Sequence, residues 1–276
     1  MKIISVAGHK KSGKTSLVER LVRELEKRGR TGTIKHLPDH EFNPQGTDTR
    51  RHMEAGASVV VGVTPSGIAT FTPRATLENA LDELANSGID YAVVEGFKDS
   101  RLPKIALGDL ELHGIVKNIS GDPASLTDTE ISDLINIIEQ QPEYHTLDSL
   151  IYSVKHNPFI KETGAIGSFT GIVRQKTGDI KTESLEFESH EKIAGDRMHL
   201  IENDLKNKEG VQEVRIHHKT GWIGPGQDIV YIVVATSHRQ QLFPALSDAI
   251  ERVKSEVPIW KKEHTTSGKF WVHEHP

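Results

Sequence analysis

The first half of the chain combines two periods of hydrophobic and polar positions. Short apolar runs are typical of buried strands, whereas apolar residues at three- and four-residue intervals indicate helices. The pattern predicts strands at residues 3–7, 31–36, 57–63, 67–71, 91–94 and 113–116, and helices at 17–25, 76–87 and 127–140. Thr127 and Glu130 form a predicted capping box for the last helix. Strands that alternate with helices predict an α/β domain with a mostly parallel, doubly wound sheet.

The second half has longer strands, several of them consecutive. The pattern predicts strands at residues 164–174, 183–189, 211–218, 228–235, 261–265 and 269–272, and helical segments at 147–156, 193–205 and 239–256. This order predicts an α+β domain. The polar residues 140–143 between the halves favour a linker. We therefore expect two domains, residues 1–142 and 147–276.

Composition narrows the possible partners and compartments. The chain has 276 residues, a formal net charge of −5 and no cysteine. This charge gives no overall attraction to nucleic acid or anionic lipid. No apolar run has membrane-spanning length, and the first residues lack a signal-peptide layout, so we expect a cytoplasmic protein. Without cysteine, the chain cannot carry sulfur on a thiol of its own.

Residues 8–15 match the phosphate-loop (P-loop) pattern G-x-x-x-x-G-K-[ST] at every fixed position. The predicted nucleotide-binding residues are Gly8, His9, Lys10, Lys11, Ser12, Gly13, Lys14 and Thr15. A strand precedes the loop and a helix follows it, which is the geometry that directs backbone N–H groups at phosphate oxygens. In that geometry Lys14 contacts the terminal phosphates and the Thr15 hydroxyl ligates Mg²⁺.

A carboxylate is expected on the Mg²⁺ side of this site. Glu95 follows a predicted strand and is the first candidate, and Asp39 is a rival. Either one, taken alone, is more typical of a solvated loop carboxylate. The guanine-reading pattern N-K-x-D is missing from the first half, so the residues predict a nucleotide without specifying its base.

Further strings in the first half are more specific than the P-loop. Ile34-Lys35-His36, Ala55-Gly56-Ala57 and Val94-Glu95-Gly96-Phe97-Lys98 occur in order. With them, residues 1–140 resemble the molybdopterin-guanine dinucleotide biosynthesis adaptor proteins. The resemblance implies a dimer that binds GTP and Mg²⁺, has weak GTPase activity, places Glu95 near the metal and works with the guanylyltransferase of molybdenum cofactor synthesis.

Basic residues mark the candidate site of the second half. Arg174 ends a predicted strand, and His238 and Arg239 begin a long helix, where free N–H groups favour anions. Lys254 lies near the end of that helix, and Pro258 reverses the chain ahead of Lys261. Two lysines held together would lower each other's pKa and leave a neutral amine for catalysis. Their spacing alone is more typical of ordinary surface lysines.

Four short sequence motifs occur in order along the second half. They are Phe169-Thr170-Gly171-x-Val173-Arg174, Pro225-Gly226-Gln227-Asp228, Ser237-His238-Arg239 and Pro258-x-Trp260-Lys261-Lys262-Glu263. With them, residues 150–276 are similar to the large, catalytic subunit of molybdopterin synthase. The resemblance implies a homodimer that binds cyclic pyranopterin monophosphate. It also implies a small ubiquitin-like partner whose C-terminal thiocarboxylate supplies the sulfur.

The resemblance also implies roles for the five basic residues. Lys254 and Lys261 would be catalytic, and Arg174, His238 and Arg239 would bind the substrate. The two resemblances together suggest a fusion of two steps of molybdenum cofactor synthesis. Two alternatives remain at this stage, a P-loop kinase of a small metabolite and a non-catalytic, GTP-dependent pterin-binding scaffold.

Overall fold

The chain divides into two units, Met1–Tyr144 and His145–Pro276. The computed structural model describes residues 1–38, 40–73, 76–177 and 180–272. Asp39, the rival carboxylate, lies outside the described residues. Within these ranges no helix is both long and apolar enough to cross a lipid bilayer.

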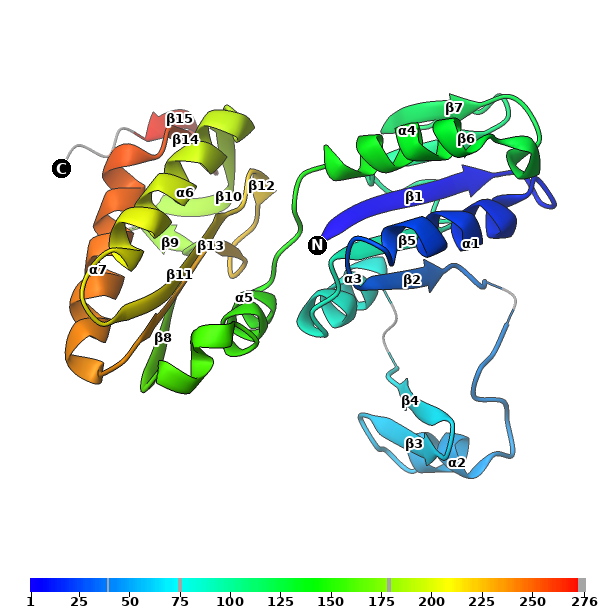
Figure 1. Cartoon of the computed structure of the whole chain (residues 1–276), viewed down its shortest axis with the longest axis horizontal. Helices are drawn as coiled ribbons and strands as arrows, with labels where there is room; N and C mark the ends of the chain where they lie inside the picture. The colour runs from blue at the N-terminus through cyan, green and yellow to red at the C-terminus, as the bar shows by residue number, and fades with distance from the viewer. Residues whose placement is uncertain (39, 74–75, 178–179, 273–276) are drawn as a thin grey trace. The chain divides into compact units, whose positions relative to one another are not determined.

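The first unit is built on a five-stranded parallel sheet with the order β2-β5-β1-β6-β7 (Figure 1). Its strands are β1 (Lys2–Gly8), β2 (Thr31–Lys35), β5 (Tyr91–Glu95), β6 (Lys104–Leu107) and β7 (Ile115–Ile119). Its other elements are α1 (Lys14–Leu25), α2 (Asp48–Glu54), β3 (Val60–Thr64), β4 (Gly67–Phe71), α3 (Leu77–Asn86), the short η1 (Pro123–Ser125) and α4 (Asp128–Glu139). The predicted parallel, doubly wound sheet is confirmed.

Two hydrophobic cores cover the two faces of this sheet. Alternate residues of β1 point to opposite faces, so Ile4 joins α1 and α4 in one core while Ile3 joins α3 in the other. The capping box predicted for α4 is present, because Thr127 and Glu130 each accept a hydrogen bond from the other's backbone N–H. The linker predicted at residues 140–143 is pinned to the first unit, since Lys2 Nζ donates to the Gln141 carbonyl and Lys2 pairs with Glu143.

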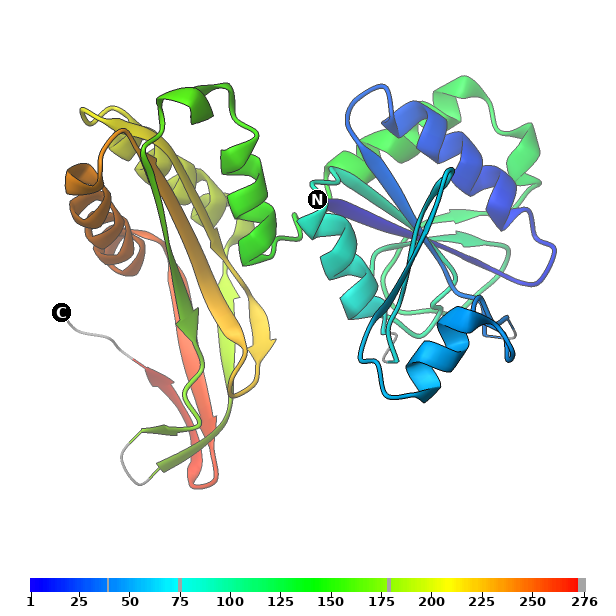
Figure 2. The same cartoon turned by 90° about the horizontal axis from the view of Figure 1, so that it is seen from below.

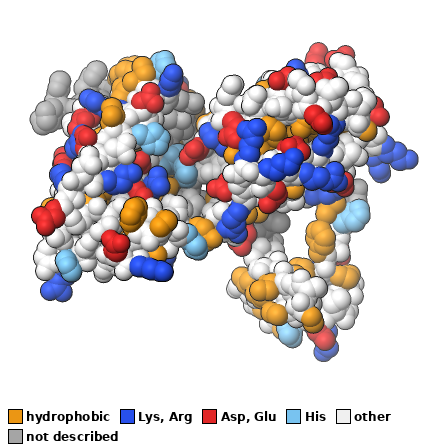
Figure 3. Space-filling model, viewed as in Figure 1, with side chains coloured by type: hydrophobic (Ala, Val, Ile, Leu, Met, Phe, Trp, Pro, Cys, Tyr) orange, Lys and Arg blue, Asp and Glu red, His pale blue; other side chains and the backbone are white. Residues whose placement is uncertain are grey.

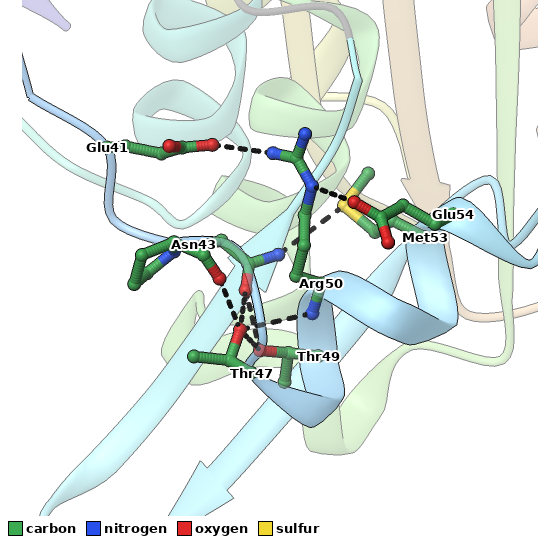
Figure 4. A network of polar contacts seen from close by, with 8 residues as sticks. Glu41, Asn43, Thr47, Thr49, Arg50, Met53 and Glu54 are labelled. Carbon is green, nitrogen blue, oxygen red and sulfur yellow. Dashed lines mark hydrogen bonds and ion pairs between the residues drawn. The ribbon is translucent and has the colours of Figure 1, made fainter.

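A hairpin of β3 and β4 with helix α2 is inserted between β2 and α3. A polar network organises the start of α2 (Figure 4): Thr47 caps the helix, and the side chain of Asn43 accepts hydrogen bonds from Thr47 Oγ1 at 2.9 Å and Thr49 Oγ1 at 2.7 Å. Arg50 pairs with Glu41 at 2.6 Å and with Glu54 at 2.9 Å. This network fixes a segment that has little apolar core of its own.

The hairpin exposes apolar side chains, which appear as an orange group on its surface in Figure 3. Val61, Val63 and Ile68 are among the exposed large hydrophobic residues, and Val63 has a relative exposure of 75%. Contiguous apolar surface of this kind usually marks an interaction site in a soluble protein.

Besides the short η1, strand β6 and helix α2 of the first unit were not predicted from the sequence. Strand β6 has only four residues and begins with the charged Lys104, so its pattern does not indicate a strand. Helix α2 has seven residues and buries none of them, so it lacks a helical apolar stripe. The strand predicted at 113–116 is observed two to three residues later, as Ile115–Ile119.

The second unit combines two antiparallel sheets with three helices (Figure 2). One sheet has the order β11-β13-β8, and the other has the order β12-β10-β14-β15 with β9 beside β10. Its strands are β8 (Ala165–Ile172), β9 (Lys176–Thr177), β10 (Ile180–Ser189), β11 (Val211–His218), β12 (Gly221–Ile223), β13 (Asp228–Thr236), β14 (Ile259–Thr265) and β15 (Gly268–Val272). Its helical elements are α5 (Leu147–Lys155), the short η2 (Pro158–Glu162), α6 (Glu191–Lys206) and α7 (Arg239–Glu256). The predicted α+β class is confirmed.

Strand β13 lies at the centre of the second unit. Ile232 and Val234 face α6 and α7, whereas Tyr231 and Val233 face α5 on the other side. A third cluster joins the two sheets and includes Phe187. The short strands β9 and β12 were not predicted, because two- and three-residue segments carry no periodicity.

His218 is a half-buried titratable group in the second unit. Its Nδ1 lies 2.7 Å from the Lys219 carbonyl, and its ring meets Phe187 edge-on at 5.1 Å. Burial lowers the pKa of His218 from its usual 6.5. Above pH 6.5 the ring is neutral in both folded and unfolded chains, so this group adds no pH dependence there. As the pH falls below 6.5, the unfolded chain takes up a proton that the folded chain excludes, which destabilises the fold.

We therefore expect wild type and His218→Phe to diverge only in acid. Between pH 6.5 and the lowered pKa, the wild type should lose up to about 1.4 kcal/mol of unfolding free energy per pH unit relative to the variant. Urea unfolding of both proteins across pH 5–8 measures this difference. Parallel stability profiles for the two proteins would show that His218 does not titrate in this way.

Candidate functional site

The P-loop connects β1 to α1 as the sequence predicts. Gly13 has φ 81° at the N-terminus of α1, a left-handed conformation that glycine adopts without strain. Gly8 is needed for space, because a Cβ there would lie 2.3 Å from Ser12 Oγ. Ser12 Oγ is itself buried and has no hydrogen-bond partner among the described residues. A buried hydroxyl without a partner is suited to a ligand oxygen in this loop.

Four side chains meet at the end of this loop. Thr15 Oγ1 donates to both carboxylate oxygens of Glu95 at 3.2 Å, and Lys35 Nζ lies 3.3 Å from Glu95 and 3.4 Å from Thr15 Oγ1. Lys14 Nζ donates to the carbonyls of Gly8 and His9 across the loop. Burial lowers the pKa of Lys14, Glu95 raises it, and the nearby Lys98 and Lys35 lower it further.

A pocket of about 850 Å³ lies over this cluster. On one side it is lined by the P-loop, and on the other by residues that follow β2 and β5. The predicted nucleotide-binding residues other than His9 line this pocket, and Glu95 lines it as well. The exposed His9 contributes its carbonyl as an acceptor for Lys14.

The donor set at this end of the pocket fits Mg²⁺. The Thr15 hydroxyl and the Glu95 carboxylate are oxygen donors, which Mg²⁺ prefers. Among the described residues no three His, Cys, Asp or Glu side chains gather at one place. Mg²⁺ commonly takes only one or two protein ligands and completes its shell with phosphates and water, so the pair is sufficient.

The segment between β5 and β6 crosses the sheet without a helix, and two buried side chains hold it. Ser5 and Lys104 are neighbours in the β1–β6 ladder and both are fully buried. Ser5 Oγ donates to the Gly96 carbonyl at 3.0 Å, and Lys104 Nζ donates to the Leu102 carbonyl at 2.9 Å and to that of Ser100. Burial lowers the pKa of Lys104. Since Glu95–Ser100 line the pocket, Lys104 positions one of its walls.

Lys104→Met should therefore loosen this crossing segment. The variant leaves two carbonyls without their donor, and an unsatisfied buried polar group costs about 1–3 kcal/mol. Chemical denaturation should show a loss of that size. Lys117→Met, on the exposed part of β7, is the control and should stay within about 0.5 kcal/mol of wild type. Equal stability of the two variants would contradict the positioning role.

The second unit separates its candidate residues along helix α7. His238 is the N-terminal flanking residue and Arg239 the first helical residue, and both are exposed. Lys254 lies in the last turn, is 58% exposed at its side chain and pairs with Glu251 at 3.9 Å. At 1.5 Å per residue, Arg239 and Lys254 are separated by about 22 Å along the helix. A single chain therefore does not bring these two ends to one small substrate.

Arg174 and Lys261 lie at the Lys254 end. Lys261 is half-buried on β14 opposite Phe187, so the two side chains share a face of the ladder. Val173, directly before Arg174, packs in the same cluster as Phe187. Strand β8 reaches Ile172 opposite Asp228, at the far end of β13 from the start of α7. The chain positions of Arg174 and Lys261 thus lie toward the Lys254 end of α7, whereas His238 and Arg239 lie at its N-terminus.

Sequence reasoning did not assign site roles to the pocket residues Lys35, His36, Phe97 and Lys98. Each of them ends or follows β2 or β5, and the carboxyl ends of neighbouring parallel strands meet at one edge of the sheet. Their positions at strand ends could have indicated that these residues lie together. The sequence did not predict β6, so the path of the segment that follows β5 was unknown.

The fold defines a P-loop domain joined to an α+β domain. Comparison with known proteins assigns each half. Residues 3–119 match the family model described as "Molybdopterin guanine dinucleotide synthesis protein B". Residues 141–256 match the family model described as "MoaE protein".

A full-length relative joins the two halves. A "Probable molybdopterin synthase" from Haloferax volcanii is 34% identical over 278 residues, which cover 99% of this chain and 100% of that protein. The chain therefore belongs to the family of this molybdopterin synthase. Both resemblances inferred from the sequence are confirmed, and the relatives do not favour the kinase and scaffold alternatives.

Other relatives match one half each. A molybdopterin synthase catalytic subunit from Pyrococcus abyssi is 30% identical over 48% of this chain and 87% of its own length. A putative molybdopterin-guanine dinucleotide biosynthesis adapter protein from Methanocaldococcus jannaschii is 40% identical over 39% of this chain and 47% of its own length. The second half is thus that of an enzyme, and the first half that of an adaptor of molybdenum cofactor biosynthesis.

Solved structures match the same halves. Molybdopterin synthase from Staphylococcus aureus is 36% identical, with 41% of this chain and 83% of that chain covered and a TM-score of 0.40. A MobB protein homolog from Bacillus stearothermophilus is 22% identical, with 51% of this chain and 100% of that chain covered and a TM-score of 0.39.

Proposed function

We propose that the second unit transfers sulfur to cyclic pyranopterin monophosphate to form molybdopterin. The donor is the C-terminal thiocarboxylate of a small ubiquitin-like partner. The support for this proposal is that Lys261 lies opposite Phe187, which packs with Val173, the residue before Arg174, in a chain that has no cysteine. Since the chain has no thiol to carry sulfur, the sulfur must be delivered by another molecule.

Each basic residue has a role in this proposal. Lys261 contacts the reacting carbon and the thiocarboxylate, and Lys254 moves protons and stabilises developing negative charge. Arg174 binds the substrate at the same end. His238 and Arg239 bind phosphate and pterin at the N-terminus of α7, where the free N–H groups and the helix dipole favour an anion.

We propose that the site is completed in a homodimer. The two ends of α7 are about 22 Å apart, and one pterin cannot bridge that distance within a single chain. A second copy resolves this by placing its Arg239 beside the Lys261 of the first. The exposed apolar hairpin of the first unit offers a further surface for association.

Mixed dimers test this arrangement. Arg239→Ala and Lys261→Ala homodimers should each lose sulfur transfer. Co-expression with two different tags allows the heterodimer to be purified, and one of its two sites then contains both wild-type residues. We expect this heterodimer to recover about half of the wild-type activity. A heterodimer as inactive as its parents would show that the two residues act within one chain.

We also propose that the first unit binds GTP and Mg²⁺. Lys14 contacts the terminal phosphates, and Thr15 and Glu95 hold the metal, which would neutralise phosphate charge. The support is the cluster of Lys14, Thr15, Glu95 and Lys35 under the pocket. Hydrolysis is expected to be weak. As an adaptor, this unit would serve the guanylyltransferase that forms molybdopterin guanine dinucleotide, with both steps in the cytoplasm.

A further inference from the structure

The pocket of the first unit extends beyond the P-loop to a second wall. This wall, the distal wall, consists of described residues that end or follow β2 and β5: Lys35, His36, Leu37, Pro38, His40, Phe97, Lys98, Asp99 and Ser100. We propose that the distal wall binds a second ligand beside the nucleotide, a pterin carrying a phosphate monoester. This inference rests on the proposed binding of a nucleotide to the P-loop.

The distal wall lies at the terminal-phosphate end of the nucleotide. Lys14 and Thr15 of a P-loop contact the last two phosphates and their Mg²⁺, and Thr15 contacts Glu95 and Lys35 here. His36 directly follows Lys35, and Phe97 comes two residues after Glu95. The base of the same nucleotide is attached beyond the opposite, first phosphate. The aromatic residues of the distal wall are therefore available to another molecule.

A stacked ring pair gives this wall a planar surface. The rings of His36 and Phe97 are 4.4 Å apart and inclined by only 21°. Phe97 packs against the core formed with α3, whereas His36 is exposed above it. Aromatic faces backed by a core are suited to stacking against a flat heterocycle.

The backbone is strained where it holds the His36–Phe97 pair together. Phe97 has φ 50°, an uncommon conformation for a bulky residue. A Cβ at the preceding Gly96 would lie 2.8 Å from the Cβ of His36, so only glycine allows the close approach. Strain of this kind persists mainly where the surrounding structure uses it.

The positive charge of the pocket is larger than a bound nucleotide with Mg²⁺ would neutralise. Its described lining includes five lysines, at positions 10, 11, 14, 35 and 98, against the two carboxylates of Glu95 and Asp99. A nucleoside triphosphate with Mg²⁺ leaves part of this positive charge unmatched. Lys98 lies on the distal wall next to Phe97, so a ligand stacked on the rings can place a phosphate near it.

A pterin monophosphate and a mononucleotide share this chemistry. The pterin is favoured because the other half of the same chain belongs to a molybdopterin synthase family. One polypeptide would then make a phosphorylated pterin and also hold one beside GTP.

The test uses full-length protein with the Arg239→Ala change, which weakens pterin binding at the second unit. The probe is 6-hydroxymethylpterin monophosphate, whose own fluorescence reports binding, with a saturating non-hydrolysable GTP analogue and Mg²⁺. We expect His36→Ala to weaken binding about fivefold and Lys98→Met about tenfold. The matched controls His52→Ala and Lys27→Met, both exposed and distant in sequence from the pocket, should leave it unchanged.

An unphosphorylated probe separates the two contributions. With 6-hydroxymethylpterin, His36→Ala should still weaken binding, whereas Lys98→Met should have no effect. If the phosphorylated probe does not bind, or if neither variant weakens it, the inference is overturned. Displacement of the probe by adenosine monophosphate at equal or lower concentration would also overturn it, because the site would then take mononucleotides. Binding of the GTP analogue is followed separately by calorimetry, so failure of the proposed nucleotide function is read from a different signal.

Discussion

Lys261→Ala should reduce the rate of molybdopterin formation by at least about 100-fold. A positioned proton-transfer group contributes about 10²–10⁴ in rate, and a group that stabilises developing charge contributes a similar factor. Lys261 is half-buried opposite Phe187, which packs with Val173, the residue before Arg174. Single-turnover assays with thiocarboxylated partner and cyclic pyranopterin monophosphate measure this rate.

Lys262→Ala is the matched control for this experiment. Lys262 is the next residue on β14, so its side chain points to the opposite face of the sheet, where it lies over the ring of Trp271. It should retain activity within about twofold of wild type. Equal losses in the two variants would assign the effect to β14 as a whole and not to the Lys261 amine.

Lys14→Ala should weaken GTP binding about 100-fold. Lys14 extends along the P-loop to the Gly8 and His9 carbonyls, a position from which its ammonium reaches two phosphates. A hydrogen bond to a charged group contributes about 1.5–3 kcal/mol, and a 100-fold loss corresponds to about 2.7 kcal/mol, so the loss of one such bond accounts for it. Calorimetric titration with GTP and Mg²⁺ measures the affinity.

The Lys14→Ala protein should also keep full sulfur transfer. Its changed residue belongs to the first unit, whereas all five candidate residues for sulfur transfer belong to the second. The control Lys27→Ala, on an exposed residue paired with Glu24 at 2.6 Å, should bind GTP like wild type. Loss of sulfur transfer in Lys14→Ala would show that the two activities are coupled.

Long elements with one clear period were predictable from the sequence. Helix α7 has the predicted bounds of Arg239–Glu256, and the strand predicted at 228–235 is observed as Asp228–Thr236. These elements bury a continuous stripe or run of apolar side chains, so their periodicity survives in the sequence. Strand β6 was not predicted because it begins with Lys104. Hydrogen bonds to carbonyls allow this lysine to be buried, and a pattern of hydrophobic residues does not reveal a buried lysine.

The residues of the P-loop were predictable because their spacing is local. Gly8 and Gly13 serve the backbone of one short loop, and Lys14 and Thr15 follow directly. The distal wall depends instead on which strands neighbour β1, and that order required the structure. The distance between Arg239 and Lys254 could have been predicted, because both lie on one 18-residue helix. The sequence motifs that contain them do not show whether the two ends of this helix serve the same site.

In the proposed function this chain inserts sulfur that a partner delivers, and it needs no nucleotide to do so. The most direct measurement mixes purified wild-type protein with cyclic pyranopterin monophosphate and the thiocarboxylated small partner, with GTP either absent or saturating, and quantifies molybdopterin. We expect product formation at the same rate in both mixtures, with two partner molecules consumed per pterin. No product in either mixture, or product only when GTP is present, would contradict it.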